Sequence, residues 1–237
     1  MTINQCDREK IVQENIAVIQ QKIQNAAKTA GRDPISIQCM AVTKTVPVPL
    51  VNIALQKGIL LLGENRVQEM LQKYNGYYLE QGKLHFIGHL QRNKVKYIID
   101  KVDMIESVDT IELAVEIDKR ARQHAKIMPI LLQINIGMEK TKSGFDTSSI
   151  YSAIENLLCL PNLSIEGLMT IPPKQEIERY FAEMQNLYID IKDKYVDNIN
   201  MRYLSMGMSR DFETAIQYGS NIVRIGTAMF GNRKYPE

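Results

Sequence analysis

The sequence predicts an α/β fold in which eight parallel strands, each followed by a helical segment, close into a (β/α)8 TIM barrel. The chain has 237 residues, close to the roughly 250 residues of a typical barrel of this kind. Apolar segments alternate with amphipathic segments along the chain, which is the order of elements in α/β proteins. The strand segments are apolar almost throughout, as expected for a parallel sheet covered on both faces.

The expected strands cover residues 35–43, 59–63, 83–88, 104–108, 128–135, 163–169, 201–206 and 222–227. Helices are expected at residues 51–57, 66–74, 111–124, 148–158, 175–194 and 209–218, with an extra N-terminal helix at about 10–30 and a solvated helix start at 92–96. A doubly wound open sheet is the competing fold, and it would usually show a glycine-rich turn after the first strand. This chain has Lys-Thr-Val-Pro there. No proline-, glycine- or serine-rich linker divides the sequence, so we expect one domain over residues 1–237.

Composition excludes several classes of function. The net charge of +2 gives no electrostatic case for nucleic acid or an anionic membrane. The polar N-terminus lacks the apolar core of a signal peptide, and the longest apolar run is too short to span a bilayer. The three cysteines and three histidines show no ligand spacing, so we expect no metal site and a cytoplasmic location.

Polar and glycine residues gather where the expected strands end, and in a barrel that rim carries the chemistry. Lys44 follows the first strand, although a lysine is rarely buried without a partner. Ser209 precedes a short helical pattern, as an N-cap would, and Gly226 and Thr227 close the last strand. Either strand end alone is ordinary structure, but hydroxyls and free amides on adjacent strand ends favour a phosphate site.

A lysine and a phosphate site at one mouth indicate a phosphorylated aldehyde as ligand. A lysine desolvated at a barrel mouth is a nucleophile that can form a Schiff base with a carbonyl. Pyridoxal 5′-phosphate carries both groups, and a sugar phosphate in a Schiff-base aldolase would use the same two elements. Arg224 is a charged residue inside an apolar strand. It either pairs with a carboxylate at a barrel–helix seam or points inward and donates to a ligand.

Seven ordered motifs, spread over nearly the whole chain, resemble those of the pyridoxal-phosphate homeostasis protein family. They are AVTKTVP, GENRVQE, HFIGHLQRNKVK, SVD, INIGMEKTKSGF, GLMTIPP and LSMGMSRDFETAIQYGSNIVRIGTAMFG. The resemblance implies the fold type III barrel of the alanine racemase N-terminal domain. It also implies the following roles: Lys44 as the Schiff-base lysine, Arg224 facing the pyridine nitrogen, Ser209, Gly226 and Thr227 at the phosphate, Ser205, Met206 and Gly207 lining the approach, and Asn65 and His89 near the ring.

The resemblance further implies a protein that holds pyridoxal phosphate and buffers or delivers it without robust catalysis. A permanent cation beside the pyridine nitrogen disfavours its protonation, which weakens the ring as an electron sink. Racemases of this fold add a second domain with a tyrosine base, and we expect none after Glu237. The expected partners are the cofactor and pyridoxal-phosphate-dependent apoenzymes, and we expect a monomer. The alternative is a fold type III amino-acid racemase-like enzyme.

Overall fold

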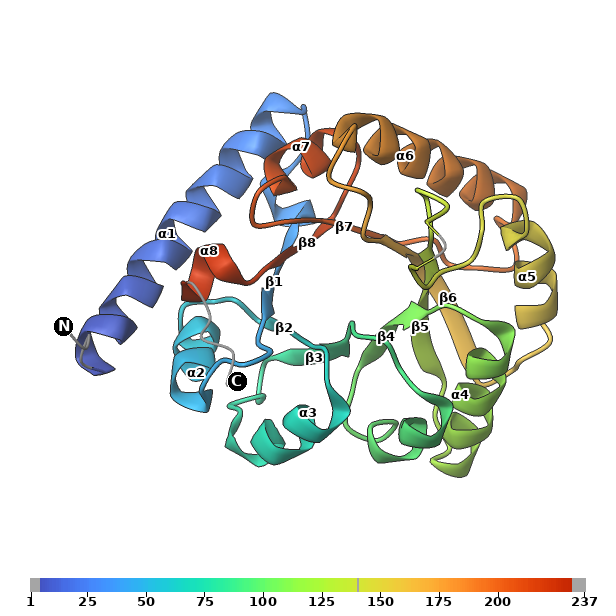
Figure 1. Cartoon of the computed structure of the whole chain (residues 1–237), viewed down its shortest axis with the longest axis horizontal. Coiled ribbons are helices and arrows are strands. Elements are labelled where there is room, and N and C mark those ends of the chain that lie inside the picture. The colour runs from blue at the N-terminus through green and yellow to red at the C-terminus, as the bar shows by residue number, and fades with distance from the viewer. Residues whose placement is uncertain (1–4, 140, 232–237) are drawn as a thin grey trace.

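The strands of the protein close into a barrel in chain order, as seen in the computed structural model, which describes residues 5–139 and 141–231 (Figure 1). The described strands are β1 (Gln38–Val42), β2 (Leu61–Glu64), β3 (Lys83–Phe86), β4 (Met104–Val108), β5 (Met128–Ile134), β6 (Leu163–Thr170), β7 (Tyr203–Met208) and β8 (Ile222–Ile225). Every neighbouring pair is parallel, and β1 pairs with both β2 and β8. This closure confirms the predicted barrel and excludes the open sheet.

Helices surround the barrel on its outside (Figure 1). The described α-helices are α1 (Gln5–Thr29), α2 (Val48–Gln56), α3 (Val67–Lys73), α4 (Ile111–Gln123), α5 (Ile150–Leu157), α6 (Ile177–Lys194), α7 (Phe212–Gln217) and α8 (Thr227–Phe230). Short 3-10 helices occur at η1 (Pro34–Ser36), η2 (Tyr74–Gly76) and η3 (Arg92–Tyr97).

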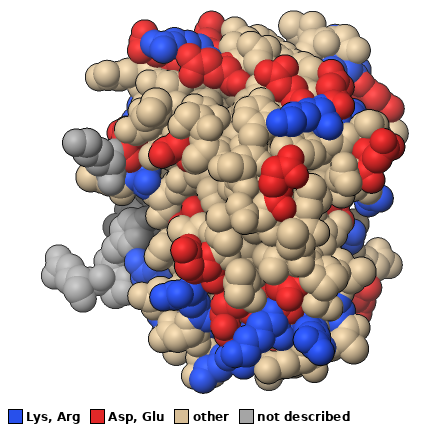
Figure 2. Space-filling model, turned by 90° about the vertical axis from the view of Figure 1, so that its right-hand side faces the viewer, with Lys and Arg blue, Asp and Glu red and all other residues tan. Residues whose placement is uncertain are grey.

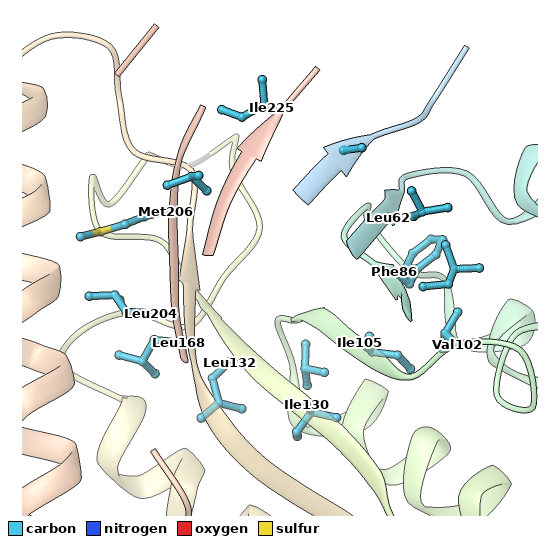
Figure 3. Packing of buried hydrophobic residues seen from close by; sticks show 14 of the residues in the cluster. Leu62, Phe86, Val102, Ile105, Ile130, Leu132, Leu168, Leu204, Met206 and Ile225 are labelled. Carbon is cyan, nitrogen blue, oxygen red and sulfur yellow. The ribbon is translucent and has the colours of Figure 1, made fainter. Parts of the chain in front are cut away.

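Two apolar layers follow from the alternation of side chains along each strand. Met40 and Val42 of β1 pack inside the barrel with Leu61 and Ile222. The intervening Ala41 belongs to the outer core between strands and helices. Figure 3 shows part of this outer core, with labelled residues from β2 to β8. The strands are therefore covered on both faces, as their composition predicted.

The extra N-terminal helix is confirmed, and it packs against α2, α7 and α8. Val12, Ile16, Ile19 and Ile23 are buried along one side of α1, at the spacing of an amphipathic helix. The side-chain amide of Asn15 donates to the carbonyl of Met229 at 3.0 Å, which ties α1 to α8.

Several element boundaries differ from the predicted ones by a few residues, and some of the differences have identifiable reasons. Helix α2 begins three residues early, because Pro47 supplies its N-cap and a further proline lies in its first turn, where the fixed φ of proline suits a helix. The helix start expected at residues 92–96 is the 3-10 helix η3. The four-residue α8 was not expected, because so short a helix has no hydrophobic period.

Charged side chains of both signs lie interspersed on the face shown in Figure 2. This distribution agrees with the nearly balanced net charge of +2.

Candidate functional site

Closure of the barrel brings six of the predicted residues to one rim, because all strands run in parallel and their carboxyl ends meet there. Shortly after strand ends lie Lys44 (β1), Asn65 (β2), His89 (β3), Ser209 (β7) and Gly226 and Thr227 (β8). The remaining predicted residues lie within two neighbouring strands: Ser205, Met206 and Gly207 in β7 and Arg224 in β8.

Lys44 lies in a turn two residues after the end of β1, and its side chain is half-buried. Its ammonium forms no ion pair or hydrogen bond with residues 5–139 and 141–231. Thr43 before it is fully buried, and Thr45 after it has a φ of 60°, in the left-handed region. The amine of Lys44 is thus held next to a strained backbone position and is not committed to any of those residues.

Ser209 joins the ends of β7 and β8. Its Oγ accepts hydrogen bonds from the backbone N–H groups of Gly226 at 3.4 Å and Ala228 at 3.2 Å. The expectation that Ser209 caps α7 is wrong, because the N-cap residue is Asp211, whose carboxylate accepts from the Met208 N–H at 2.6 Å. Ser209 instead caps the start of α8, so a hydroxyl and two backbone amides meet at this point of the rim.

A chain of buried polar side chains crosses the inside of the barrel. The Arg224 guanidinium donates to the Ser205 hydroxyl at 2.7 Å and to the Thr170 carbonyl at 2.7 Å. The Ser205 hydroxyl donates to Oε2 of Glu106 at 2.6 Å, and Oε1 of Glu106 lies 2.7 Å from Nδ1 of His85. Arg224 therefore points inward rather than into a barrel–helix seam.

Glu106 is the counter-charge of this interior network. Burial lowers the pKa of the Arg224 guanidinium, while the charges of Glu106 and Asp211 act in the opposite direction. Sequence reasoning missed Glu106, although an acidic residue inside the apolar strand MIESV is the same kind of signal as the arginine in β8. A buried charge of either sign requires a partner, and each of these residues was evidence for the other.

Met206 and Gly207 lie near the carboxyl end of β7. The Met206 side chain is fully buried in the outer core, on the helix side of β7 (Figure 3). Gly207 has a φ of 91°, and a Cβ there would lie 2.6 Å from the Ala215 Cβ. Glycine at this position lets α7 pack against β7 close to Ser209.

Asn65 presents a buried acceptor without a partner. Its Oδ1 is inaccessible and accepts no hydrogen bond from the described residues. Gly88 packs directly on the Asn65 backbone, where a Cβ would meet the carbonyl oxygen at 2.0 Å. His89 is 64% exposed, with Nδ1 3.3 Å from Oδ2 of Asp109. Leaving a buried acceptor unpaired costs about 1–3 kcal/mol, so the Asn65 amide fits a site completed by a polar ligand.

The described residues hold neither a metal-binding cluster nor a membrane-spanning helix. No cluster of three or more His, Cys, Asp or Glu side chains within them is arranged to hold a metal ion. None of the helices in the same ranges combines the length and apolar character needed to cross a bilayer.

Known proteins resemble this chain along nearly its full length. The family model described as alanine racemase, N-terminal domain, matches residues 14–234. A pyridoxal phosphate homeostasis protein of Aquifex aeolicus is 41% identical over 226 residues, covering 94% of this chain and 98% of the relative. A protein of the same name from Escherichia coli strain K12 is 35% identical over 232 residues, covering 94% and 97%.

Solved structures share the same barrel. An unknown protein from Bifidobacterium adolescentis has a TM-score of 0.88 and 31% identity, over 96% of this chain and 97% of that one. PipY of Synechococcus elongatus, solved with pyridoxal phosphate bound, has a TM-score of 0.80 and 28% identity, over 93% and 100%. An alanine racemase of Clostridium difficile has a TM-score of 0.72 and 18% identity, and the match covers 94% of this chain and 58% of the racemase. That last similarity concerns the fold alone.

Proposed function

The chain belongs to the pyridoxal phosphate homeostasis protein family, and from that premise we propose that it binds pyridoxal 5′-phosphate and acts in the homeostasis of this cofactor. The observation that carries the proposal is the meeting of two features at one rim. The Lys44 amine has no partner among the described residues, and Ser209 gathers two backbone amides on the ends of β7 and β8.

The residues at the rim fit the chemical groups of the cofactor. Pyridoxal phosphate supplies an aldehyde that condenses reversibly with a primary amine, together with a phosphate and an aromatic ring. We assign the amine to Lys44. Ser209, Gly226 and Thr227 are assigned to the phosphate, because hydroxyls and amides at a helix start suit an anion.

The other predicted residues surround these two contacts. Arg224 is assigned to the ring nitrogen, and Asn65 and His89 to the ring's surroundings. Ser205 holds Arg224 by a hydrogen bond at 2.7 Å. Met206 and Gly207 are assigned to the approach. The unpartnered Oδ1 of Asn65 is the observation that supports a polar ligand beside β2.

We propose buffering and delivery rather than turnover. The curated relatives are named as homeostasis proteins and not as enzymes. Arg224 is buried, and arginine keeps its positive charge in proteins. A cation beside the ring nitrogen opposes the protonation that carbanion chemistry needs. Retention without reaction is therefore the role that these side chains support.

The proposal extends to location and partners. Cys6, Cys39 and Cys159 are all free thiols, which suits the reducing cytoplasm. We propose a cytoplasmic monomer of one domain whose partners are the cofactor and the apoenzymes that receive it. Light scattering of the purified protein tests the monomer, and transfer of cofactor to an added apoenzyme tests the delivery.

Cofactor retention tests the central part of the proposal. Pyridoxal 5′-phosphate is mixed with the purified protein, free cofactor is removed, and the bound fraction is measured by visible absorbance. We expect stoichiometric retention by the wild type and little by Lys44→Ala. The control is Lys57→Ala, because Lys57 is exposed where α2 ends, at the opposite end of the barrel. Full retention by Lys44→Ala would contradict the assignment of the amine.

Turnover is tested separately with optically pure alanine. We expect the protein to racemise alanine no faster than free cofactor does. Racemisation well above that background would favour the racemase-like enzyme instead.

A further inference from the structure

The peptide groups on both sides of Lys44 are bound by side chains of α3. The carbonyl of Thr43, which precedes Lys44, accepts a hydrogen bond from Nζ of Lys73 at 2.9 Å. The N–H of Thr45, which follows Lys44, donates to Oε1 of Glu69. The two hydrogen bonds hold the peptide groups before and after Lys44, and they thereby restrain its φ and ψ angles. Helix α3 thus fixes the backbone that carries the Lys44 side chain.

The strained backbone of Thr45 explains why this turn needs to be held in place. A β-branched residue with a φ of 60° is in the left-handed region, which is strained for any side chain of this kind. Strained conformations persist only where surrounding groups over-determine them, and they concentrate at functional sites. The bond from the Thr45 N–H to Glu69 supplies this restraint on one side of Lys44.

A buried carboxylate anchors Lys73, which in turn contacts Glu69. Nζ of Lys73 lies 2.8 Å from Oε1 of Glu69 and 2.6 Å from Oε1 of Glu64, and Glu64 is fully buried on β2. The same Glu64 oxygen accepts from the Thr43 hydroxyl at 2.7 Å and from the Tyr77 hydroxyl at 2.6 Å. The cluster therefore connects β1, β2 and α3 at the level of Lys44.

The two lysines of this region are in opposite situations. The Lys73 ammonium has two carboxylates and a carbonyl as partners, which use the three donors of a lysine. The Lys44 ammonium has no partner within the described ranges. An ion pair that served only to attach α3 to the barrel would not need to bind both peptide groups that flank the uncommitted lysine.

We propose that Glu69 and Lys73 are positioning residues that hold the Lys44 amine in place for covalent attachment of the cofactor. The inference rests on the proposed function, because it concerns the reaction of that amine. Loss of the hydrogen bonds to Glu69 and from Lys73 leaves the Lys44 amine present but allows the turn after β1 to leave its strained conformation. Attachment then becomes slower, while contacts to the phosphate and ring remain.

Two ligands separate positioning from binding. Pyridoxal phosphate reports attachment, through the rate at which visible absorbance appears. Pyridoxine 5′-phosphate has the same ring and phosphate but no aldehyde, so its Kd reports binding alone. For Glu69→Gln and Lys73→Met we expect attachment slower by about tenfold or more, since small misplacements of a reacting group have large effects on rate. The Kd for pyridoxine phosphate is expected to stay within about twofold.

Matched variants define the comparison. Lys73→Arg keeps the cation and should recover part of the rate. Glu116→Gln removes an equivalent i,i+4 ion pair on α4, where Glu116 lies 2.6 Å from Arg120, and it should leave both measurements unchanged. In the wild type, the Thr45 amide hydrogen should exchange slowly with solvent. This measurement tests the hydrogen bond from the Thr45 N–H to Glu69 without any substitution.

The outcomes are distinct. Wild-type attachment rates in folded Glu69→Gln and Lys73→Met, equal weakening of both ligands, or fast exchange of the Thr45 amide would overturn the inference. A wild-type protein that binds neither ligand would overturn the proposed function itself. Slow attachment with unchanged pyridoxine phosphate binding supports the inference.

Discussion

Two buried glutamates of this barrel, Glu106 inside it and Glu64 outside it, make contrasting use of the same side chain. Each oxygen of Glu106 has one partner: His85 at 2.7 Å and Ser205 at 2.6 Å. Through Ser205 the carboxylate reaches Arg224. The interior network is therefore complete, and its residues are held in an apolar environment where a missing partner is costly.

Glu64 is used unevenly. Its Oε1 is shared by Thr43, Tyr77 and Lys73, whereas Oε2 is buried and has no partner in the described ranges. This outer cluster, made of Thr43, Glu64, Glu69, Lys73 and Tyr77, joins the residue before Lys44 to α3 and to Tyr77. The interior network holds the Arg224 side chain inside the barrel. The outer cluster instead holds the backbone on both sides of Lys44.

The largest expected effect comes from opening the interior network. Glu106→Ala removes the carboxylate that Ser205 links to the buried Arg224 and leaves the Ser205 hydroxyl and the His85 ring without that acceptor. Leaving buried polar groups unpaired costs about 1–3 kcal/mol, and more for charged groups. The free energy of unfolding, measured with urea, should fall by that amount. Glu106→Gln is the control, because it keeps an acceptor for Ser205 and should lose less. A loss below about 1 kcal/mol for the alanine variant, the size of an ordinary hydrogen bond, would show that the network is not the main source of stability here.

An intermediate effect is expected from the outer cluster at alkaline pH. Burial, and next the neighbouring charge of Glu64, raise the pKa of Tyr77 above its ordinary value of 10.0. The unfolded chain then releases this proton at lower pH than the folded chain. The stability linked to Tyr77 is therefore fully present below pH 10 and declines as the pH rises above it.

The size of this pH effect is about 1 kcal/mol between pH 10 and pH 11 for one such group. Tyr77→Phe should remove that part of the decline in the free energy of unfolding. Tyr78→Phe is the matched control, because the neighbouring Tyr78 is 57% exposed, and it should decline like the wild type. Identical pH profiles for Tyr77→Phe and the wild type would contradict the burial of that hydroxyl against Glu64.

The smallest expected change in stability is at the rim between β7 and β8. Ser209→Ala removes the acceptor for two backbone N–H groups, and the loss of such a cap costs about 1 kcal/mol. Thr110→Ala is the control, because the Thr110 hydroxyl caps α4 by accepting from the Leu113 N–H at 3.2 Å. Both variants should lose similar stability by urea denaturation, but only Ser209→Ala should weaken binding of pyridoxine phosphate. Equal affinity in the two variants would separate Ser209 from the phosphate.

The barrel was predictable because its strands are buried on both faces, which leaves long apolar segments in the sequence. Burial of both faces is a local property, so the strands appeared within a few residues of their positions. The start of α7 was less accessible. Its N-cap residue is Asp211, whose carboxylate accepts a hydrogen bond from the Met208 N–H. Ser209, two residues earlier, is an equally good N-cap residue by type.

The site was predictable only in part. Three site residues stand out in the sequence because a charged or polar residue lies in or next to an apolar strand or at a helix start: Lys44, Ser209 and Arg224. Glu106 meets its partner Ser205 across 99 residues of sequence, and only closure of the barrel brings them together. In the sequence, Lys73 looks like the lysine of any surface i,i+4 ion pair. The local sequence pattern does not show how α3 is placed against β1.

Reduction with borohydride followed by peptide mapping tests the central claim most directly. Protein loaded with pyridoxal 5′-phosphate is reduced, digested and searched for peptides that carry the pyridoxyl mass. We expect a single labelled lysine, Lys44, and no label at Lys73, because the Lys73 ammonium is paired with two carboxylates. A label on Lys73, or a protein that remains unlabelled after loading and reduction, would contradict the account.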